Sequence, residues 1–297
     1  MIKPPYLKPG DKVGIAATAR KISLSEIQYA INTFTEWGFE VVLPEGLYLQ
    51  DHQLAGTDAE RATALQSLLD NPEIKAVFCA RGGYGTIRIV DLLDWTQFAK
   101  HPKWIVGYSD ITVLHGHINQ TLGIASLHAT MAFNITPEEE RQAAIASLKE
   151  ALTGNPVVHT LNSHPMNKEG NASSVVVGGN LSVLYSMMGS VSFPDTDGKI
   201  LFLEDLDEYL YHIDRMMMGL KRAGKLTRLA ALVVGGMTDM RDNAVPFGKT
   251  AEQIIYDAVK EYNYPLYFGL QAGHIANNLA LPMGVSGTIT GNTLTFG

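Results

Sequence analysis

The feature that most constrains the fold is a regular alternation of short apolar runs and amphipathic segments in the first half of the chain. Five apolar runs predict strands at residues 12–18, 41–43, 74–80, 104–108 and 124–127. This spacing favours right-handed βαβ units and a parallel sheet covered by helices on both faces. Apolar residues do not alternate with polar ones in these runs, as expected for strands buried on both sides. The first half is therefore predicted to be an α/β domain.

Helices are predicted between these strands. Ser23 with Glu26, and Thr57 with Glu60, have the spacing of capping boxes, in which the side chains at a helix start satisfy its free backbone N–H groups. Further helices are expected at residues 86–95, at residues 110–122, and from a capped start at residues 136–139 with a proline in the first turn.

The regular alternation of predicted strands and helices ends after about residue 153. Residues 154–172 are rich in Pro, Asn, Gly and Ser, which is typical of a linker or long connection. Strands are then expected at residues 175–177, 199–203, 229–234 and 266–268, with helices at 181–188, 211–223 and 249–262. The tail from residue 278 is β-like, with turns at 282–284 and 291–292. We predict two domains, residues 1–165 and a smaller one at 166–297.

Composition excludes several classes of protein. The 297 residues carry a formal net charge of −7 with no Lys/Arg cluster, which argues against a nucleic acid or an anionic membrane as partner. No apolar run approaches the roughly 20 residues that span a bilayer. The first ten residues hold three prolines and do not resemble a signal peptide. The single cysteine, Cys79, excludes an internal disulfide and fits a reducing compartment. We therefore expect a cytoplasmic protein.

Two segments that could carry chemistry lie in the first half. Sites in parallel α/β sheets form beyond the carboxyl ends of the strands. Ser109 stands where the fourth strand ends and a helix begins, the geometry of a nucleophile elbow, although Ser109 or Asp110 could simply cap that helix. The glycines of residues 82–85 could bring backbone N–H groups to an oxyanion or a phosphate, or could form a plain tight turn.

Two more segments lie in the second half. Glu204 follows an apolar run directly and is the best placed of its acidic neighbours for a buried role, whereas Asp207 and Glu208 fit a solvated loop. His274 follows Gly273 at the end of a strand, and could be a base or a turn histidine without a task.

The other histidines do not indicate a metal. His115 and His117 are two residues apart on a helix and point to different faces, so they form a poor pair of ligands. His128 ends the fifth strand and is expected to border the site, whereas His212, on a helix among apolar residues, is expected to have a structural role. Since the sequence has no H-E-x-x-H or Cys-x-x-Cys motif, we expect neither metal nor cofactor.

Taken together and in this order, the motifs resemble the LD-carboxypeptidase family of serine peptidases, which also includes the microcin self-immunity peptidases. The motifs are Arg81-Gly82-Gly83-Tyr84-Gly85, Gly107-Tyr108-Ser109-Asp110, Gly178-Gly179-Asn180, Leu203-Glu204-Asp205 and Gly273-His274. The resemblance implies an N-terminal flavodoxin-like parallel-sheet domain, similar to class I amidotransferases, and a smaller C-terminal α/β domain rich in β. It also implies a homodimer.

The resemblance implies a role for each site residue. Ser109 is the nucleophile, Glu204 the acid and His274 the base of a triad, and the N–H groups of Gly83 and Asp110 form the oxyanion hole. The sequence departs from the family after the fifth strand, where His128-Ala129-Thr130 replaces the frequent His-Gly-Pro. This departure bears on the peptide bound more than on the reaction.

The activity implied is release of terminal D-alanine from a murein tetrapeptide with diaminopimelate or lysine at its third position. Arg81 is expected to receive the terminal carboxylate, and Gly82, Tyr84 and His128 to contact the substrate. One alternative is an immunity peptidase acting on aminoacyl or peptidyl sulfamoyl-adenylates. Others are a non-catalytic binding protein and an amidotransferase relative with a cysteine nucleophile, although Cys79 lies inside an apolar strand.

Overall fold

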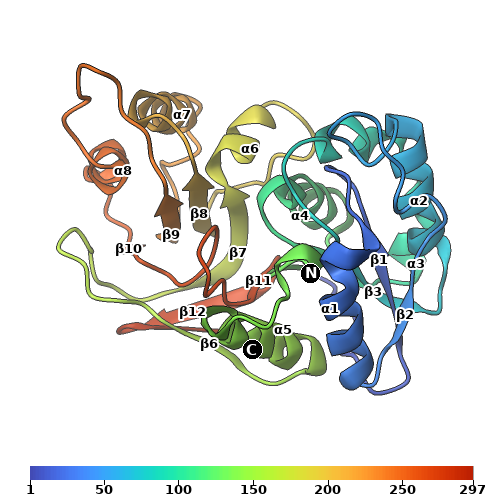
Figure 1. Ribbon diagram of the computed structural model, residues 1–297. Helices are drawn as coiled ribbons and strands as arrows, with labels where there is room; N and C mark the ends of the chain where they lie inside the picture. Colours follow the sequence, from blue (N-terminus) through green and yellow to red (C-terminus); the bar gives the residue numbers. More distant parts are fainter. Residues whose placement is uncertain (297) are drawn as a thin grey trace.

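The computed structural model describes residues 1–296 and contains two sheets (Figure 1). The first has six strands in the order β11-β5-β4-β3-β1-β2. Its five N-terminal strands are parallel, and β11, from far along the chain, adds to β5 antiparallel. The bounds are β1 Lys12–Ala16, β2 Glu40–Val42, β3 Ile74–Cys79, β4 Trp104–Gly107, β5 Ser126–His128 and β11 Leu281–Met283. The five predicted strands of the first half are thus confirmed.

The second sheet has seven strands in the order β10-β9-β8-β7-β12-β13-β6. Strands β7 to β10 are parallel, whereas β12, β13 and β6 are antiparallel. The bounds are β6 Val157–Thr160, β7 Ala172–Asn180, β8 Ile200–Leu206, β9 Ala231–Thr238, β10 Leu266–Phe268, β12 Ser286–Thr290 and β13 Thr293–Phe296. The molecule is therefore mixed α/β with two parallel-strand units, as predicted. Below, each sheet with its helices is called the N-terminal or the C-terminal half.

The helices start largely where the sequence predicts. Both capping boxes form, at α1 (Leu24–Glu36) and α2 (Asp58–Asp70). Helix α5 (Gln142–Thr153) starts later than expected, because residues 139–141 form a separate 3-10 turn and no side chain caps the start at Arg141. In the C-terminal half, α6 spans Leu181–Ser186, α7 Leu210–Arg222 and α8 Ala251–Val259.

The helix predicted at residues 86–95 is wrong. Two short 3-10 turns, Thr86–Arg88 and Val90–Leu92, replace it, and α3 (Thr96–Lys100) begins only after them. The backbone of this segment bonds to other parts of the chain: Thr86 N donates to the Asp110 carboxylate, and Asp94 N donates to Gln66. These tertiary partners take the place of helical hydrogen bonds, and no local pattern reveals them.

The predicted linker at 154–172 is also partly wrong. Residues 157–160 form β6, which pairs antiparallel with β13 some 130 residues later in the chain, at Thr293–Phe296. A partner so distant in sequence is invisible to local composition. Because β6 lies in the second sheet and β11 in the first, the chain crosses between the halves more than once, and the boundary near residue 165 stays a prediction.

The two halves share a core where their strand ends meet. Helix α4 (Thr112–His117), which follows β4, lies beside β7 and α6 (Figure 1). One apolar cluster includes Val113 and Leu114 from α4 together with Leu181 and Leu184 from α6. Gly179 allows β7 to approach α4, since a Cβ there would lie 2.5 Å from the Thr112 hydroxyl. No helix among residues 1–296 is long and apolar enough to cross a membrane.

Candidate active site

Ser109 occupies a sharp turn at the carboxyl end of β4. It begins a 3-10 turn (Ser109–Ile111) and has a φ of +64°, a conformation that residues other than glycine rarely adopt. The neighbouring loop comes very close: a Cβ added to Gly82 would lie 3.3 Å from Ser109 Oγ. The turn thus presents a hydroxyl on a strained backbone, as a nucleophile elbow does.

Two side chains from the C-terminal half meet this hydroxyl. His274 Nε2 lies 3.0 Å from Ser109 Oγ, and His274 Nδ1 lies 2.6 Å from Glu204 Oε2. The same carboxylate oxygen accepts the backbone N–H of His274 at 3.1 Å. Gly273 makes this approach possible, because a Cβ there would lie 2.7 Å from the Glu204 carboxylate. The three residues picked out in the sequence therefore form one hydrogen-bonded series that crosses between the halves.

Burial and charge act against each other at His274. The Glu204 side chain is fully buried at the end of β8, and the His274 side chain is 12% exposed. Burial disfavours a charged imidazole, but the Glu204 carboxylate, its hydrogen bond and the Asp205 carboxylate together raise the pKa of His274 above its usual value. The arrangement favours an imidazole that accepts a proton from the Ser109 hydroxyl.

Asp205, next to the acid, has a separate task. Its carboxylate accepts hydrogen bonds from Asn180 Nδ2 at 2.9 Å and from Ser182 N at 3.0 Å. Burial, with the charge of Glu204 adding to it, raises the pKa of Asp205 to about 7. Asp205 thereby joins β8 to the start of α6, beside the site.

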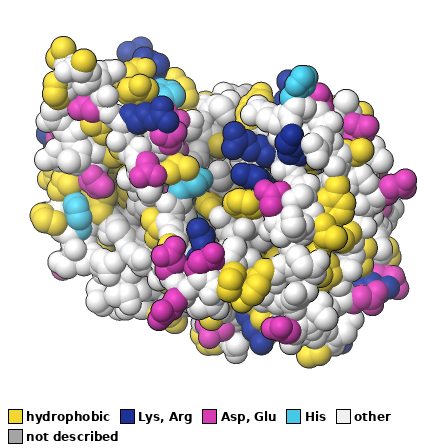
Figure 2. Space-filling view, viewed as in Figure 1, with side chains coloured by type: hydrophobic (Ala, Val, Ile, Leu, Met, Phe, Trp, Pro, Cys, Tyr) yellow, Lys and Arg dark blue, Asp and Glu magenta, His cyan; other side chains and the backbone are white. Residues whose placement is uncertain are grey.

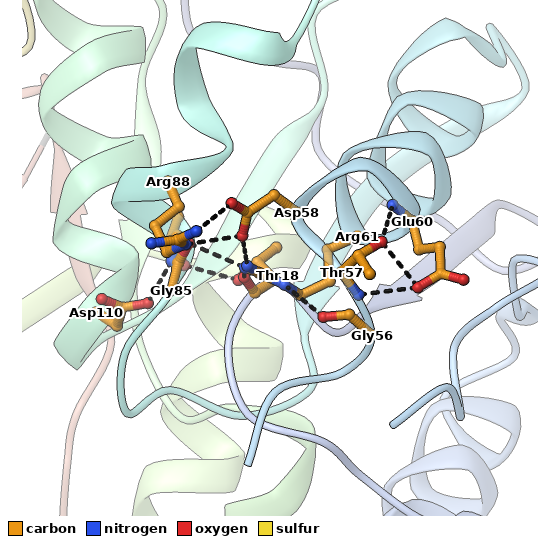
Figure 3. A network of polar contacts seen from close by, with 10 residues as sticks. Thr18, Gly56, Thr57, Asp58, Glu60, Arg61, Gly85, Arg88 and Asp110 are labelled. Atoms are coloured by element: carbon orange, nitrogen blue, oxygen red, sulfur yellow. Dashed lines mark hydrogen bonds and ion pairs between the residues drawn. The ribbon is translucent and has the colours of Figure 1, made fainter. Parts of the chain in front are cut away.

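A buried arginine fixes the glycine turn at the end of β3 (Figure 3). The Arg61 side chain has no exposed surface, and its Nη1 donates to the carbonyls of Thr18 at 2.6 Å and Gly85 at 2.9 Å. Arg61 also pairs with Asp58, which in turn receives two hydrogen bonds from Arg88 at 2.8 and 2.6 Å. Such a network positions the backbone of the turn by satisfying its carbonyls.

The Asp110 carboxylate connects the glycine turn to the serine turn. It accepts the N–H of Thr86 at 2.8 Å and is buried. Burial raises the pKa of Asp110, against the opposing effect of its hydrogen bonds with Thr86. Asp110 stands in the first turn of its helix, where backbone N–H groups have no helical partner. Asp110 and Gly83 line one cleft of about 390 Å³, together with Tyr84 and residues of α6.

The remaining predicted residues lie around this centre. Arg81 forms an ion pair with Glu26 at 3.2 Å, and its guanidinium stacks over Phe133 at 4.2 Å. Tyr84 is 50% exposed beside the cleft. His128 is fully buried, with its ring 5.9 Å from that of Tyr108, and burial lowers its pKa well below the usual value.

The structure also bears on the cysteine alternative. Cys79 is buried inside β3, and burial raises the pKa of its thiol to about 12, so it is no nucleophile. Residues 1–296 contain no group of three or more His, Cys, Asp or Glu that could hold a metal ion.

Sequence reasoning missed two contributors. The Tyr108 ring lies edge-on to His274 with centroids 4.9 Å apart, and its hydroxyl donates to Asn134 at 3.3 Å. Burial raises the pKa of Tyr108 to about 12, so the hydroxyl stays protonated. Its position just before Ser109 was the available signal. Arg61 offered none, because an arginine in an amphipathic helix ordinarily indicates an exposed face.

Comparison with known proteins finds one family across both halves of the chain. Residues 13–129 match the family profile described as LD-carboxypeptidase N-terminal domain, and residues 173–289 match the LD-carboxypeptidase C-terminal domain. A probable murein peptide carboxypeptidase of Bacillus subtilis is 37% identical over 289 residues, which cover 95% of this chain and 89% of the relative. A murein tetrapeptide carboxypeptidase of Pseudomonas aeruginosa is 31% identical over 301 residues, covering 95% and 94%.

Solved structures show the same architecture. The muramoyltetrapeptide carboxypeptidase of Oxalobacter formigenes superposes with a TM-score of 0.85 at 27% identity, covering 96% of this chain and 98% of that one. The microcin C7 self immunity protein MccF superposes with a TM-score of 0.88 at 21% identity, covering 99% and 97%. At that identity, the second likeness shows a common fold.

Proposed function

Since the chain belongs to the LD-carboxypeptidase family of serine peptidases, we propose that it releases terminal D-alanine from murein tetrapeptide, using Ser109 as nucleophile. The observation that carries the proposal is the series from Ser109 Oγ through His274 to Glu204, with contacts of 3.0 and 2.6 Å. Relatives named as murein peptide carboxypeptidases match nearly the whole chain. A triad is defined by such geometry and not by the order of its members in the sequence.

Acylation begins when His274 Nε2 takes the proton of the Ser109 hydroxyl. The oxygen attacks the carbonyl carbon of the third residue, diaminopimelate or lysine, and the carbonyl π electrons move onto its oxygen. The N–H groups of Gly83 and Asp110 receive this oxyanion, and each such donor contributes roughly 3–4 kcal/mol to lowering a barrier of this kind. Glu204 keeps the proton of His274 Nδ1 in place and stabilises the imidazolium.

The C–N bond then breaks, and the imidazolium gives its proton to the departing amine of D-alanine. Water, deprotonated by the same imidazole, attacks the ester on Ser109. Collapse of the second oxyanion breaks the ester bond and returns the proton to the serine oxygen. The products are the tripeptide acid and D-alanine, and the reaction uses no oxidant or cofactor.

The setting of the reaction follows from its substrate. Muropeptides available for recycling would meet this enzyme in the cytoplasm, and we keep the cytoplasmic location and the homodimer as predictions. The acidic chain and the proposed peptide substrate give no reason to expect nucleic acid or membrane as a partner.

The test is release of D-alanine from purified murein tetrapeptide, followed by mass spectrometry for the protein and for its Ser109→Ala variant. We expect release by the first and none by the second. A pentapeptide ending in D-alanyl-D-alanine is the control, since its terminal bond joins two D residues and should remain intact. If the protein instead cleaves an aminoacyl sulfamoyl-adenylate and leaves the tetrapeptide whole, the immunity-peptidase function replaces this one. If neither is cleaved, the non-catalytic alternative prevails.

A further inference from the structure

The proposed substrate and the site carry charge of the same sign. A murein tetrapeptide ends in a carboxylate, and diaminopimelate adds another on its side chain. Around Ser109 the chain places three buried acidic side chains: Asp110, Glu204 and Asp205. Two carboxylates brought together repel each other strongly in a partly desolvated site. Provided that the proposed function holds, a cation must stand near Ser109 to receive the substrate.

The arginines nearest the glycine turn are mostly committed to other partners. Arg61 and Arg88 share the Asp58 carboxylate. Arg81, the candidate suggested by the sequence, is paired with Glu26 and stacked on Phe133. Drawing Arg81 toward a ligand would leave Glu26 without its cation. Drawing Arg61 or Arg88 away would leave Asp58 with one of its two cations. Both losses oppose the movement.

Arg20 differs from these three. It lies in the loop after β1 and is exposed, and it takes part in none of the ion pairs formed by residues 1–296. Its stem packs along the glycine turn: a Cβ added to Gly83 would lie 2.6 Å from Arg20 Cδ and 3.1 Å from Arg20 Nε. Figure 2 shows Lys and Arg side chains gathered near the middle of the face, between the two halves.

Arg20 and Ser109 lie beside neighbouring residues of the same glycine turn. A Cβ added to Gly83 would meet Arg20, and one added to the preceding Gly82 would meet Ser109. Consecutive Cα atoms are about 3.8 Å apart. In the substrate, the terminal carboxylate carbon is three bonds, about 3.5 Å, from the carbonyl carbon that Ser109 attacks. A guanidinium also matches a carboxylate with two parallel hydrogen bonds.

We propose that Arg20 binds a carboxylate group of the peptide substrate beside the Gly82–Gly83 turn and thereby selects for anionic peptides. Two carboxylates offer this chemistry: that of the departing D-alanine, and that on the side chain of diaminopimelate. Arg20 is free to turn toward either, because only its stem is held, by packing against Gly83.

The experiment compares kcat/KM for three tetrapeptides: the diaminopimelate peptide, its D-alaninamide form, and the lysine peptide. Each is tested with the native chain, Arg20→Ala and Arg20→Lys. Lys21→Ala is the matched control, since it removes one exposed charge from the next position, where Lys21 contacts Gln50. Arg141→Ala tests a second arginine, which forms none of the ion pairs in the described part of the chain and whose charge acts on the Tyr108 hydroxyl.

For the native chain, kcat/KM of the diaminopimelate peptide should exceed that of either the amide or the lysine peptide, whichever lacks the bound carboxylate, by about 10- to 100-fold. This is the range for a hydrogen bond between charged groups. Arg20→Ala should abolish that preference, acting mainly through KM, and Arg20→Lys should restore part of it. If Arg20→Ala no longer distinguishes the diaminopimelate peptide from its D-alaninamide form, Arg20 binds the carboxylate of the departing D-alanine. If it no longer distinguishes the diaminopimelate peptide from the lysine peptide, Arg20 binds the carboxylate on the diaminopimelate side chain. Lys21→Ala should keep the native preference.

Three results would overturn the proposal. Arg20→Ala could lower kcat/KM for all three tetrapeptides by one common factor, or it could leave all three values unchanged. Alternatively, Arg141→Ala rather than Arg20→Ala could remove the preference for the carboxylate. The Ser109→Ala chain gives a second readout, since it should bind the tetrapeptide without turnover, and adding Arg20→Ala should weaken that binding by a similar factor. If the native chain releases no D-alanine while Ser109→Ala still binds the peptide through Arg20, the proposed reaction fails and the binding role stands. If the peptide neither binds nor reacts, both fail.

Discussion

The two halves hold their parts of the site by different means. The N-terminal half positions Ser109 through its backbone: a φ of +64°, a glycine turn and a buried arginine bound to carbonyls. The C-terminal half positions His274 through charge, with a fully buried carboxylate 2.6 Å from the imidazole. We infer that the first half should be sensitive to added volume and lost hydrogen bonds, and the second to lost charge at constant volume.

The largest effect should come from removing charge in the C-terminal half. Glu204→Gln keeps the shape but can no longer hold the proton on His274 Nδ1 or stabilise the imidazolium. We expect kcat to fall roughly 10³- to 10⁴-fold, with the unfolding midpoint nearly unchanged. Steady-state kinetics and thermal unfolding measure the two quantities. A loss of less than tenfold would show that charge does not organise this half.

A single added methyl group should have the next largest effect, in the N-terminal half. The Cβ of Gly82→Ala would lie 3.2 Å from Ser109 Cβ and 3.3 Å from both Ser109 Oγ and Met131 Cε. Since Gly82 has no positive φ, the substitution tests volume without backbone strain. We expect kcat to fall about 10- to 100-fold through displacement of the nucleophile. A variant with native kcat would contradict the claim that this half is sensitive to volume.

Arg61→Lys tests the hydrogen bonds of the N-terminal half while keeping the charge. A lysine cannot reproduce the fork that reaches the Thr18 and Gly85 carbonyls and Asp58 together. We expect the unfolding free energy to drop by about 1–3 kcal/mol, measured by urea denaturation, and kcat to drop several-fold. Arg88→Lys is the matched control, because it alters an exposed partner of the same Asp58. Equal effects of the two substitutions would rule out a special role for the buried site.

The smallest expected effect is a shift of the pH profile. The imidazole must be neutral to act as a base, so kcat/KM should fall as the pH drops below the raised pKa of His274. Removing the Glu204 charge lowers that pKa, so the remaining activity of Glu204→Gln should extend to lower pH. Asp205→Asn should move the acid limb in the same direction by less, because Asp205 contributes least to the shift and, with its own pKa raised to about 7, is partly protonated over this limb. A shift toward higher pH in either variant would contradict this electrostatic account.

The sequence predicted the parts of the site that depend on position along a strand. Ser109 follows β4, Glu204 lies near the carboxyl end of β8, and His274 lies in the loop after β10. Parallel sheets collect their carboxyl strand ends at one edge. Their pairing came from the family resemblance, because strand positions alone do not say which ends of two separate sheets face each other.

The sequence did not predict what depends on distant partners. Strand β6 forms because β13 lies beside it, and the helix expected at 86–95 is lost to bonds with Asp110 and Gln66. Arg61 is buried where carbonyls from three separate loops converge on it, and Arg81 forms an ion pair with Glu26, which lies 55 residues earlier in the sequence. Each of these outcomes is a tertiary contact that no local pattern records.

The most direct test of the central claim, that two differently built halves form one site, is the rate at which a fluorophosphonate modifies Ser109. Intact-mass and peptide mass spectrometry would follow the native chain, His274→Ala and Glu204→Gln. We expect one label, on Ser109, in the native chain, and modification slowed by a factor of roughly 10³ in both variants, because the second half activates the nucleophile of the first. Labelling of Ser109 at the native rate in His274→Ala, or at another residue in the native chain, would contradict the account.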